Sequence, residues 1–229
     1  MVSEVSNSLL NEYLMKIGII GAGSMGRALA AIWAQQGHAI CLSFARDEVA
    51  LRRQVAELLG ASSGTPAEAA RFGDVVLLAV PYPTLAEALV GVADAMAGKP
   101  VLTCVSGLRP DFEGQTIGLP TERTESVAEE IARLLPAAQV VEAFNTTFAE
   151  ILQAPKRHFG DQNPSVLYCG DHAPAKAVAA QLIAEAGYQP LDLGTLRHAR
   201  SLETLATVWV QLAATTGLLP NAGLQILTR

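Results

Sequence analysis

One stretch near the amino end constrains this chain more than any other. A short apolar run, a glycine-rich turn and a helical pattern follow one another there without a break. Residues 17–20 predict a buried strand and residues 27–34 predict a helix, with Gly-x-Gly-x-x-Gly spacing between them at Gly21, Gly23 and Gly26. A strand, a glycine turn and a helix in that order are the context in which this spacing binds dinucleotides.

Each glycine of such a turn has its own task. Gly21 permits the tight turn, Gly23 lets the backbone approach a pyrophosphate, and Gly26 lets the helix pack closely on the strand. The free N–H groups at the start of the helix then face the phosphates, helped by the helix dipole. The residues expected to hold the pyrophosphate are Gly21, Ala22, Gly23, Ser24, Met25 and Gly26.

The end of the second strand predicts which nucleotide binds. A protein that reads the adenine ribose of NAD places Asp or Glu about 20 residues beyond the glycines. Here residues 43–46 are Ser-Phe-Ala-Arg instead. Ser43 and Arg46 are the candidates for holding a 2′-phosphate, since a guanidinium makes paired, charge-assisted hydrogen bonds. Asp47 follows and is interpreted as a capping charge at a helix start. NADP is therefore predicted over NAD.

The rest of the chain alternates strand and helix patterns, with about eight strands in all. This alternation predicts an α/β protein with a doubly wound, mostly parallel sheet of the Rossmann type and a C-terminal extension of strand and helix. We expect residues 1–14 to be an N-terminal extension. Residues 15–229 are expected to form a single NADP-binding domain, whose C-terminal extension begins at about residue 148. Residues 60–65 predict a loop. Residues 108–125 predict a longer loop, which is a candidate lid.

Two further segments are expected at the carboxyl ends of strands, where doubly wound sheets bind ligands. Ala79, Val80 and Pro81 end a continuous apolar run and are expected to flank the nicotinamide half of the cofactor. The alternative is that the prolines here only begin a helix. Asn145 and Thr146 end another strand and are expected to line the same cleft, donating hydrogen bonds to a ring carbonyl. For these two the alternative is simple helix capping.

Composition narrows the classes of function. The net charge of −6 and the lack of a Lys/Arg cluster argue against nucleic acid as a partner. No apolar run approaches the roughly 20 residues of a membrane helix, and residues 1–14 lack the layout of a signal peptide, so a cytoplasmic protein is expected. Three distant cysteines predict free thiols and no metal site. His38 is expected to be solvated. Residues 200–216 predict a helix that is either buried or covered by a second subunit in a homodimer.

Several later segments carry a more selective resemblance. The most distinctive pieces are Val-Val-Glu-Ala-Phe-Asn-Thr at 140–146, Gly-Asp at 170–171, Asp-Leu-Gly at 192–194 and Ala-Arg-x-x-Glu at 199–203. Together with the glycine turn, they resemble the NADPH-dependent F420 oxidoreductase family. The family's basic grip on the 2′-phosphate falls here on residues 44–46, where Arg46 keeps the charge.

The resemblance implies an enzyme that moves a hydride between NADPH and a flavin or deazaflavin (coenzyme F420-like) acceptor, a small molecule. When both reactants carry redox-active rings, the protein supplies mainly binding and orientation, so no catalytic side chain is assigned. Two alternatives remain open at this point. One is a non-catalytic NADP-binding sensor or regulator. The other is an imine reductase of the pyrroline-5-carboxylate reductase kind.

Overall fold

A computed structural model describes residues 14–107, 125–154, 159–218 and 221–227 of the chain. The expected N-terminal extension and the expected long loop at 108–125 therefore lie almost wholly outside the described residues.

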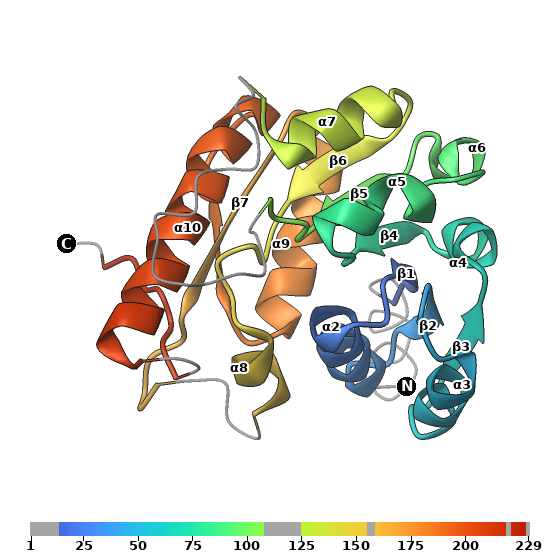
Figure 1. Ribbon diagram of the computed structural model, residues 1–229, viewed down its shortest axis with the longest axis horizontal. Coiled ribbons are helices and arrows are strands. Elements are labelled where there is room, and N and C mark those ends of the chain that lie inside the picture. Colours follow the sequence, from blue (N-terminus) through green and yellow to red (C-terminus); the bar gives the residue numbers. More distant parts are fainter. Residues whose placement is uncertain (1–13, 108–124, 155–158, 219–220, 228–229) are drawn as a thin grey trace, which may run out of the picture.

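One eight-stranded sheet runs through the molecule, in the order β3-β2-β1-β4-β5-β6-β7-β8 (Figure 1). The strands are β1 (Lys16–Ile20), β2 (Ala39–Ser43), β3 (Ala61–Gly64), β4 (Val75–Leu78), β5 (Pro100–Thr103), β6 (Gln139–Glu142), β7 (Ser165–Gly170) and β8 (Gln189–Asp192). The first six are parallel and follow the Rossmann order. β7 runs antiparallel to β6, and β8 pairs parallel with β7. The expected mostly parallel, doubly wound sheet is confirmed.

Helices cover both faces of this sheet, with a hydrophobic cluster under each layer. One layer holds α2 (Ser24–Gln35), α3 (Glu48–Ala56) and α9 (Ala173–Glu185). The other holds α4 (Pro66–Phe72), α5 (Leu85–Ala88), α6 (Ala93–Met96), α7 (Val127–Leu134) and the start of α10 (Ala199–Thr216). The short elements are η1 (Tyr82–Thr84), α8 (Ala149–Gln153) and η2 (Leu196–His198). Among the described helices, none combines the length and the apolar character that crossing a membrane requires.

The strand β3 was not expected, because residues 60–65 predict a loop. Its sequence, Ala-Ser-Ser-Gly, contains no β-branched or aromatic residue, and those are the residues that favour strands. It forms because β2 offers a free edge: Ile40 to Ser43 align with Ala61 to Gly64. Ser62 Oγ also donates to Ile40 O at 3.2 Å. Pairing with a neighbour therefore overrides the weak local preference.

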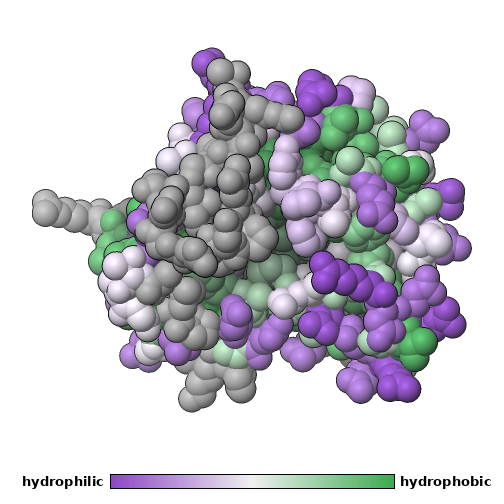
Figure 2. Space-filling view, in the orientation of Figure 1, coloured by the Kyte–Doolittle hydropathy of each residue, from purple (hydrophilic) through white to green (hydrophobic). Residues whose placement is uncertain are grey.

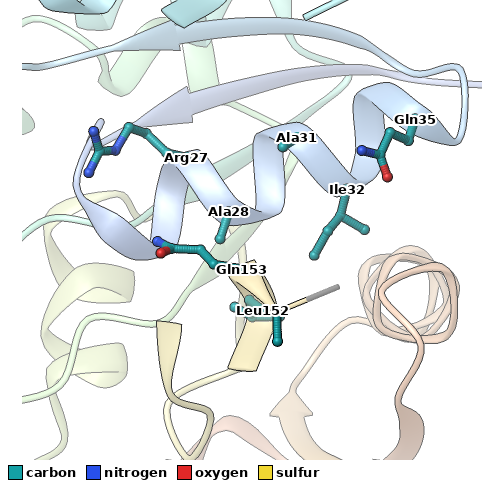
Figure 3. Close-up of a pocket in the computed structure, with 8 residues that line it drawn as sticks. Arg27, Ala28, Ala31, Ile32, Gln35, Leu152 and Gln153 are labelled. Carbon is teal, nitrogen blue, oxygen red and sulfur yellow. The ribbon is translucent and has the colours of Figure 1, made fainter. Parts of the chain in front are cut away.

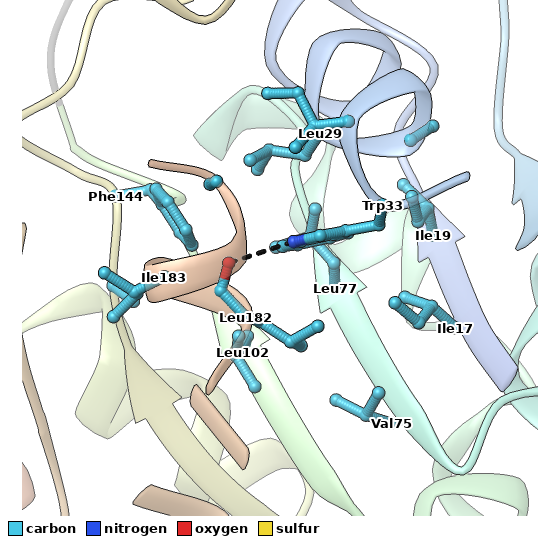
Figure 4. Close-up of a cluster of buried hydrophobic side chains, with 14 of the residues drawn as sticks. Ile17, Ile19, Leu29, Trp33, Val75, Leu77, Leu102, Phe144, Leu182 and Ile183 are labelled. Atoms are coloured by element: carbon cyan, nitrogen blue, oxygen red, sulfur yellow. Dashed lines mark hydrogen bonds between the residues drawn. The ribbon is translucent and has the colours of Figure 1, made fainter. Parts of the chain in front are cut away.

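A tryptophan joins the first half of the chain to the second. Trp33 on α2 is fully buried, and its Nε1 donates to Leu182 O on α9 at 3.0 Å (Figure 4). Its ring meets Phe144 edge-on at 6.2 Å between centroids, and Phe144 meets Tyr188 in the same way at 6.3 Å. The C-terminal strands and α9 thus share one core with the glycine-turn half.

His38 is buried, at 1% exposure, so the expectation that it is solvated is wrong. Its Nδ1 accepts a hydrogen bond from the Met15 amide at 3.0 Å, which leaves Nε2 as the atom that donates to Glu185 at 2.7 Å. A partner on α9, far away in the sequence, takes the place of water. Through these two bonds His38, just before β2, connects the end of α9 with the residue that precedes β1.

Candidate functional site

The glycine turn is anchored on the end of β2. The Gly21 amide donates to Ser43 O at 3.0 Å and the Ala22 amide donates to Phe44 O at 3.2 Å. Gly21 has φ +121°, a conformation that favours glycine, and an added Cβ would lie 2.3 Å from Ala79 O. A Cβ at Gly26 would lie 1.9 Å from Gly21 O. These two glycines are therefore required by the fold itself.

Gly23 differs from both of its neighbours in the motif. An added Cβ there would meet nothing within 4 Å, and its φ of −75° suits any residue. The fold therefore does not require glycine at this position. A side chain here would occupy the space above the start of α2, which is where a pyrophosphate approaches the backbone in dinucleotide-binding turns.

The start of α2 is left open to an anion. Three other helices that follow parallel strands are capped by their own side chains, through Asp47 on α3, Thr65 on α4 and Ser126 on α7. Gly23 gives α2 no side-chain cap, and the first turn of this helix holds no acidic residue. It holds Arg27 instead, at the amino-terminal end of the helix in Figure 3. Unpaired N–H groups beside a cation fit the charge of a phosphate.

The end of β2 leaves only one of the two expected phosphate ligands accessible. Ser43 is fully buried, and its Oγ donates to Ile19 O on β1 at 2.9 Å. Its hydroxyl thus points into the sheet, which argues against the expected role on a 2′-phosphate. Arg46 is exposed and makes no hydrogen bond or ion pair with any residue in the described part of the chain. Asp47 accepts from the amides of Val49 and Ala50, as expected for a cap.

Residues 79–81 lie directly against the glycine turn. The Ala79 amide donates to Ile20 O at 2.9 Å, which continues the pairing of β4 with β1 past the last strand residue. Val80 is 5% exposed and packs in the core, whereas Ala79 is half-buried and Pro81 is exposed. The side chains of Ala79 and Pro81 are thus the accessible ones at this edge. Val80 can contribute only backbone.

Asn145 and Thr146 are buried at the end of β6, 8% and 5% exposed. Phe144, just before them, has φ +63°, a rare conformation for an aromatic residue and one found at binding sites. Asn145 Nδ2 donates to Glu142 Oε1 at 2.6 Å, which uses one of its two N–H groups. Asn145 Oδ1 and Thr146 Oγ1 have no hydrogen-bond partner among the described residues. Asn145 therefore offers an unpartnered acceptor beside its second N–H, and the donor role expected from the sequence stays a prediction.

Glu142 sits beneath these residues as a buried carboxyl, fully shielded from solvent. Burial raises its pKa well above the ordinary value, and the carboxylates of Glu203 and Glu129 raise it further. Burial therefore favours the neutral form of this carboxyl, which accepts from Asn145 through Oε1. The sequence signal for it was a lone acidic residue inside an apolar strand, which the sequence analysis did not assign to the site.

Glu203 on α10 is the second buried carboxyl, and it accepts a hydrogen bond from the Ala128 amide at the start of α7 at 3.2 Å. Burial raises its pKa to about 7, against the lowering effect of the Ala128 and Val127 amides. Nearby, Arg200 makes a two-pronged ion pair with Glu129 at 2.7 and 2.8 Å. The Ala-Arg-x-x-Glu segment thus fixes α10 to the amino end of α7.

Replacing Glu203 by glutamine should remove a pH-dependent loss of stability. The pKa is raised from 4.5 to about 7 in the folded protein, so this group favours folding at low pH and favours it less as the pH rises towards 7. Glutamine keeps an oxygen for the Ala128 amide but does not ionise. We expect the unfolding free energy of Glu203→Gln, relative to the unaltered protein, to rise by about 1–3 kcal/mol between about pH 5 and pH 8. Urea unfolding at several pH values measures this difference, and Glu57→Gln, at an exposed position, is the control. A difference in unfolding free energy that stays constant from about pH 5 to pH 8 would contradict the prediction.

A hollow of about 570 Å³ lies between α2 and α8, away from the glycine turn for most of its length. Its lining residues are Arg27, Ala28, Ala31, Ile32, Gln35, Leu152, Gln153 and Ala154. Figure 3 shows that it follows the side of α2 from Arg27 to Gln35, with Leu152 and Gln153 facing it from α8. It lies along the helix rather than across the carboxyl ends of the strands, so we do not assign the nucleotide to it.

Figure 2 shows near-neutral and apolar side chains towards the middle of the viewed face and hydrophilic ones at its right-hand border.

The Rossmann sheet, the open glycine turn and the uncapped α2 define a protein of the dinucleotide-binding class. The comparisons indicate that it is an NADP-dependent oxidoreductase. Residues 16–107 match the model of the family described as NADP oxidoreductase, coenzyme F420-dependent. This match covers 92 of the 229 residues, and over that part the chain resembles the family.

Individual relatives agree with the family. The F420-dependent NADP reductase of Methanothermobacter marburgensis is 27% identical over 223 residues, which cover 93% of this chain and 98% of the relative. Metalloreductase STEAP3 of Rattus norvegicus is 31% identical over 195 residues, and the match covers 83% of this chain but only 36% of that protein. A crystal structure described as an F420-dependent NADP-reductase of Arthrobacter sp. FB24 is 29% identical, with a TM-score of 0.82 over 93% of this chain and all of that one.

Imine reductases share the fold alone. The enzyme of Myxococcus stipitatus is 22% identical, with a TM-score of 0.63 over 89% of this chain and 64% of its own.

Proposed function

We propose that this chain transfers a hydride between NADPH and a flavin or deazaflavin acceptor. The observation that carries the nucleotide half is the open space over Gly23, beside an α2 start that has neither a cap nor an acidic residue. The family and the names of the F420-dependent relatives support the acceptor half. NADPH supplies the hydride when it is bound; the protein supplies position and a shielded site.

The residues divide into two groups by what they would hold. In our proposal the pyrophosphate lies on the backbone of residues 21–26, with Arg27 beside it, and Arg46 holds the 2′-phosphate. Ala79 and Pro81 flank the nicotinamide, with Val80 contributing backbone. Asn145 and Thr146 face the ring that exchanges the hydride. Residues 15–229 then act as one NADP-binding unit, and the carboxyl edge of its sheet is the site.

The chemistry needs few charged groups at the reacting atoms. A hydride passes directly between two rings, so the main requirements are contact within about 3.5 Å and exclusion of water. The raised pKa of Glu142, which favours its neutral form, suits this, because a carboxylate under Asn145 would place a net charge beneath a hydride donor. The buried, unpartnered oxygens of Asn145 and Thr146 orient a polar ring without taking part in proton transfer.

NADPH oxidation by the purified protein tests this proposal, with F420, FMN, FAD, a quinone and a cyclic imine offered in turn. F420 or FMN should support turnover, and the imine should not. Turnover with the imine alone would move the protein to the imine-reductase alternative. Tight NADPH binding with no turnover on any acceptor would favour a sensor.

Replacing Asn145 by alanine should lower the turnover number with a flavin or deazaflavin acceptor by about tenfold, equivalent to about 1.4 kcal/mol. The affinity for NADPH should change little, because the pyrophosphate and 2′-phosphate contacts are elsewhere. The variant also leaves Glu142 without its partner, so the unfolding free energy should drop by about 1–3 kcal/mol. Steady-state rates and NADPH calorimetry are measured on the same folded sample. A loss of NADPH affinity with unchanged turnover at saturation would place Asn145 on the nucleotide.

A further inference from the structure

Trp209 on α10 is a buried donor without an acceptor. Its side chain is half-buried, yet its Nε1 is shielded from solvent and has no hydrogen-bond partner among the described residues. A buried indole N–H normally finds a partner, and an unpaired one costs about 1–3 kcal/mol. Trp33 shows the ordinary arrangement, since its Nε1 donates to Leu182 O at 3.0 Å. The unpaired N–H of Trp209 is therefore a candidate contact for a ligand.

Trp209 is also brought to the proposed acceptor side of the site. Its ring stacks on that of Phe148, with 6.2 Å between centroids and 21° between planes. Phe148 caps α8 and follows Asn145 and Thr146 by two to three residues. Stacked rings lie about 3.5 Å apart, so a third ring would need about 7 Å between the two and cannot enter. The pair forms a single aromatic wall beside residues 145 and 146.

The unpartnered atoms near this wall are of complementary kinds. Trp209 Nε1 is a donor, Asn145 Oδ1 is an acceptor, and Thr146 Oγ1 can act as either. A ligand that satisfies them needs a hydrogen-bond acceptor and an N–H donor on one polar edge, with a flat surface for the wall. A quinone presents acceptors only, and a simple imine presents one nitrogen. The pyrimidine edge of a flavin or deazaflavin presents carbonyl, N–H and carbonyl in a row.

We propose that Phe148 and Trp209 form the wall of the acceptor subsite, in which Trp209 Nε1 donates to a ring carbonyl and Asn145 Oδ1 accepts from the ring N–H of a flavin or deazaflavin. This assignment rests on the proposed function. It adds α10 to a site whose other residues lie in the glycine turn and at the ends of strands.

The variant Trp209→Phe tests it, because phenylalanine keeps an aromatic ring and removes only the donor and part of the wall. Calorimetry with the NADP⁺-bound protein should give dissociation constants for FMN and for F420 that are about five- to tenfold higher than for the unaltered protein. The KM for the acceptor should rise in parallel, and the dissociation constant of NADPH should stay the same. Phe148→Leu, which removes the other half of the wall, should also weaken the acceptor and not NADPH. Val208→Ala, on the exposed side of α10, is the matched control and should change none of these values.

The outcomes separate this inference from the function on which it rests. If FMN or F420 binds and turns over, and neither Trp209→Phe nor Phe148→Leu changes its affinity, the wall is wrong and the proposed function stands. If the unaltered protein binds NADPH but neither FMN nor F420, the acceptor class and the wall both fail. Thermal unfolding of each variant shows whether a loss of affinity comes from an unstable fold. If one of the two wall variants is unstable, the affinity of the other one tests the wall.

Discussion

Gly23→Val should abolish NADPH binding and leave the fold intact. An added Cβ at Gly23 meets no protein atom within 4 Å, and the backbone there has an ordinary φ of −75°, so the folded chain can accept a side chain. The same side chain would stand where we place the pyrophosphate. We expect the dissociation constant for NADPH to rise at least about 100-fold, equivalent to about 2.7 kcal/mol, with the melting temperature nearly unchanged. Calorimetry and thermal unfolding on one preparation give both numbers.

Gly26→Val is the matched control for this experiment. It adds the same atoms three residues away, but the new Cβ would lie 1.9 Å from Gly21 O, so helix and turn would have to separate. This variant should lose stability as well as affinity. The contrast between the two shows whether the loss at Gly23 comes from the ligand or from the fold. Normal NADPH binding by a folded Gly23→Val protein would place the nucleotide elsewhere.

Arg46→Glu should weaken NADPH far more than NADH and so remove the preference for NADPH. The unaltered protein is expected to bind NADPH at least about tenfold more tightly than NADH, a difference of about 1.4 kcal/mol. Arg46 is exposed and makes no bond to any described residue, so its guanidinium is available to a 2′-phosphate. A glutamate there repels that phosphate and can accept from the 2′-hydroxyl of NADH. NADPH should weaken at least about 30-fold and NADH less than about threefold, measured by calorimetry at fixed salt.

Arg53→Glu controls for charge, since it makes the same change on the exposed surface of α3. It should shift both nucleotides alike and only slightly. Equal affinities of the unaltered protein for NADPH and NADH would remove the assignment of Arg46. If Arg53→Glu loses as much NADPH affinity as Arg46→Glu, the effect comes from the net charge of the protein and not from a contact of Arg46 with the 2′-phosphate.

The features that the sequence predicted well are local ones. The glycine turn, the strand before it and the helix after it lie within 20 residues, and their spacing alone specifies the geometry. The cap expected at Asp47 is equally local, and its bonds from the Val49 and Ala50 amides form. The mostly parallel, doubly wound sheet follows from the alternation of strands and helices along the chain. Such signals need no knowledge of distant partners.

The features that the sequence left out depend on contacts between distant segments. His38 is buried because Glu185, 147 residues away, accepts from its ring. Ser43 turns away from the ligand edge because Ile19 O on the neighbouring strand accepts from its hydroxyl. Glu142 has a raised pKa because the core buries it and the carboxyl of Glu203 on α10 lies near it. Each of these partners is fixed only by the tertiary fold, which the local pattern does not contain.

Isotope transfer from NADPH tests the central claim most directly. The unaltered protein is mixed with NADPH carrying deuterium at the transferable position of the nicotinamide, and with F420 or FMN in the absence of metal ions. The account predicts that one NADPH is oxidised for each acceptor reduced. With F420, whose reduced ring keeps the transferred hydrogen on carbon, the deuterium should appear in the product. Gly23→Val should show neither. NADPH that binds tightly and stays reduced with both acceptors, or is oxidised without deuterium reaching reduced F420, would contradict it.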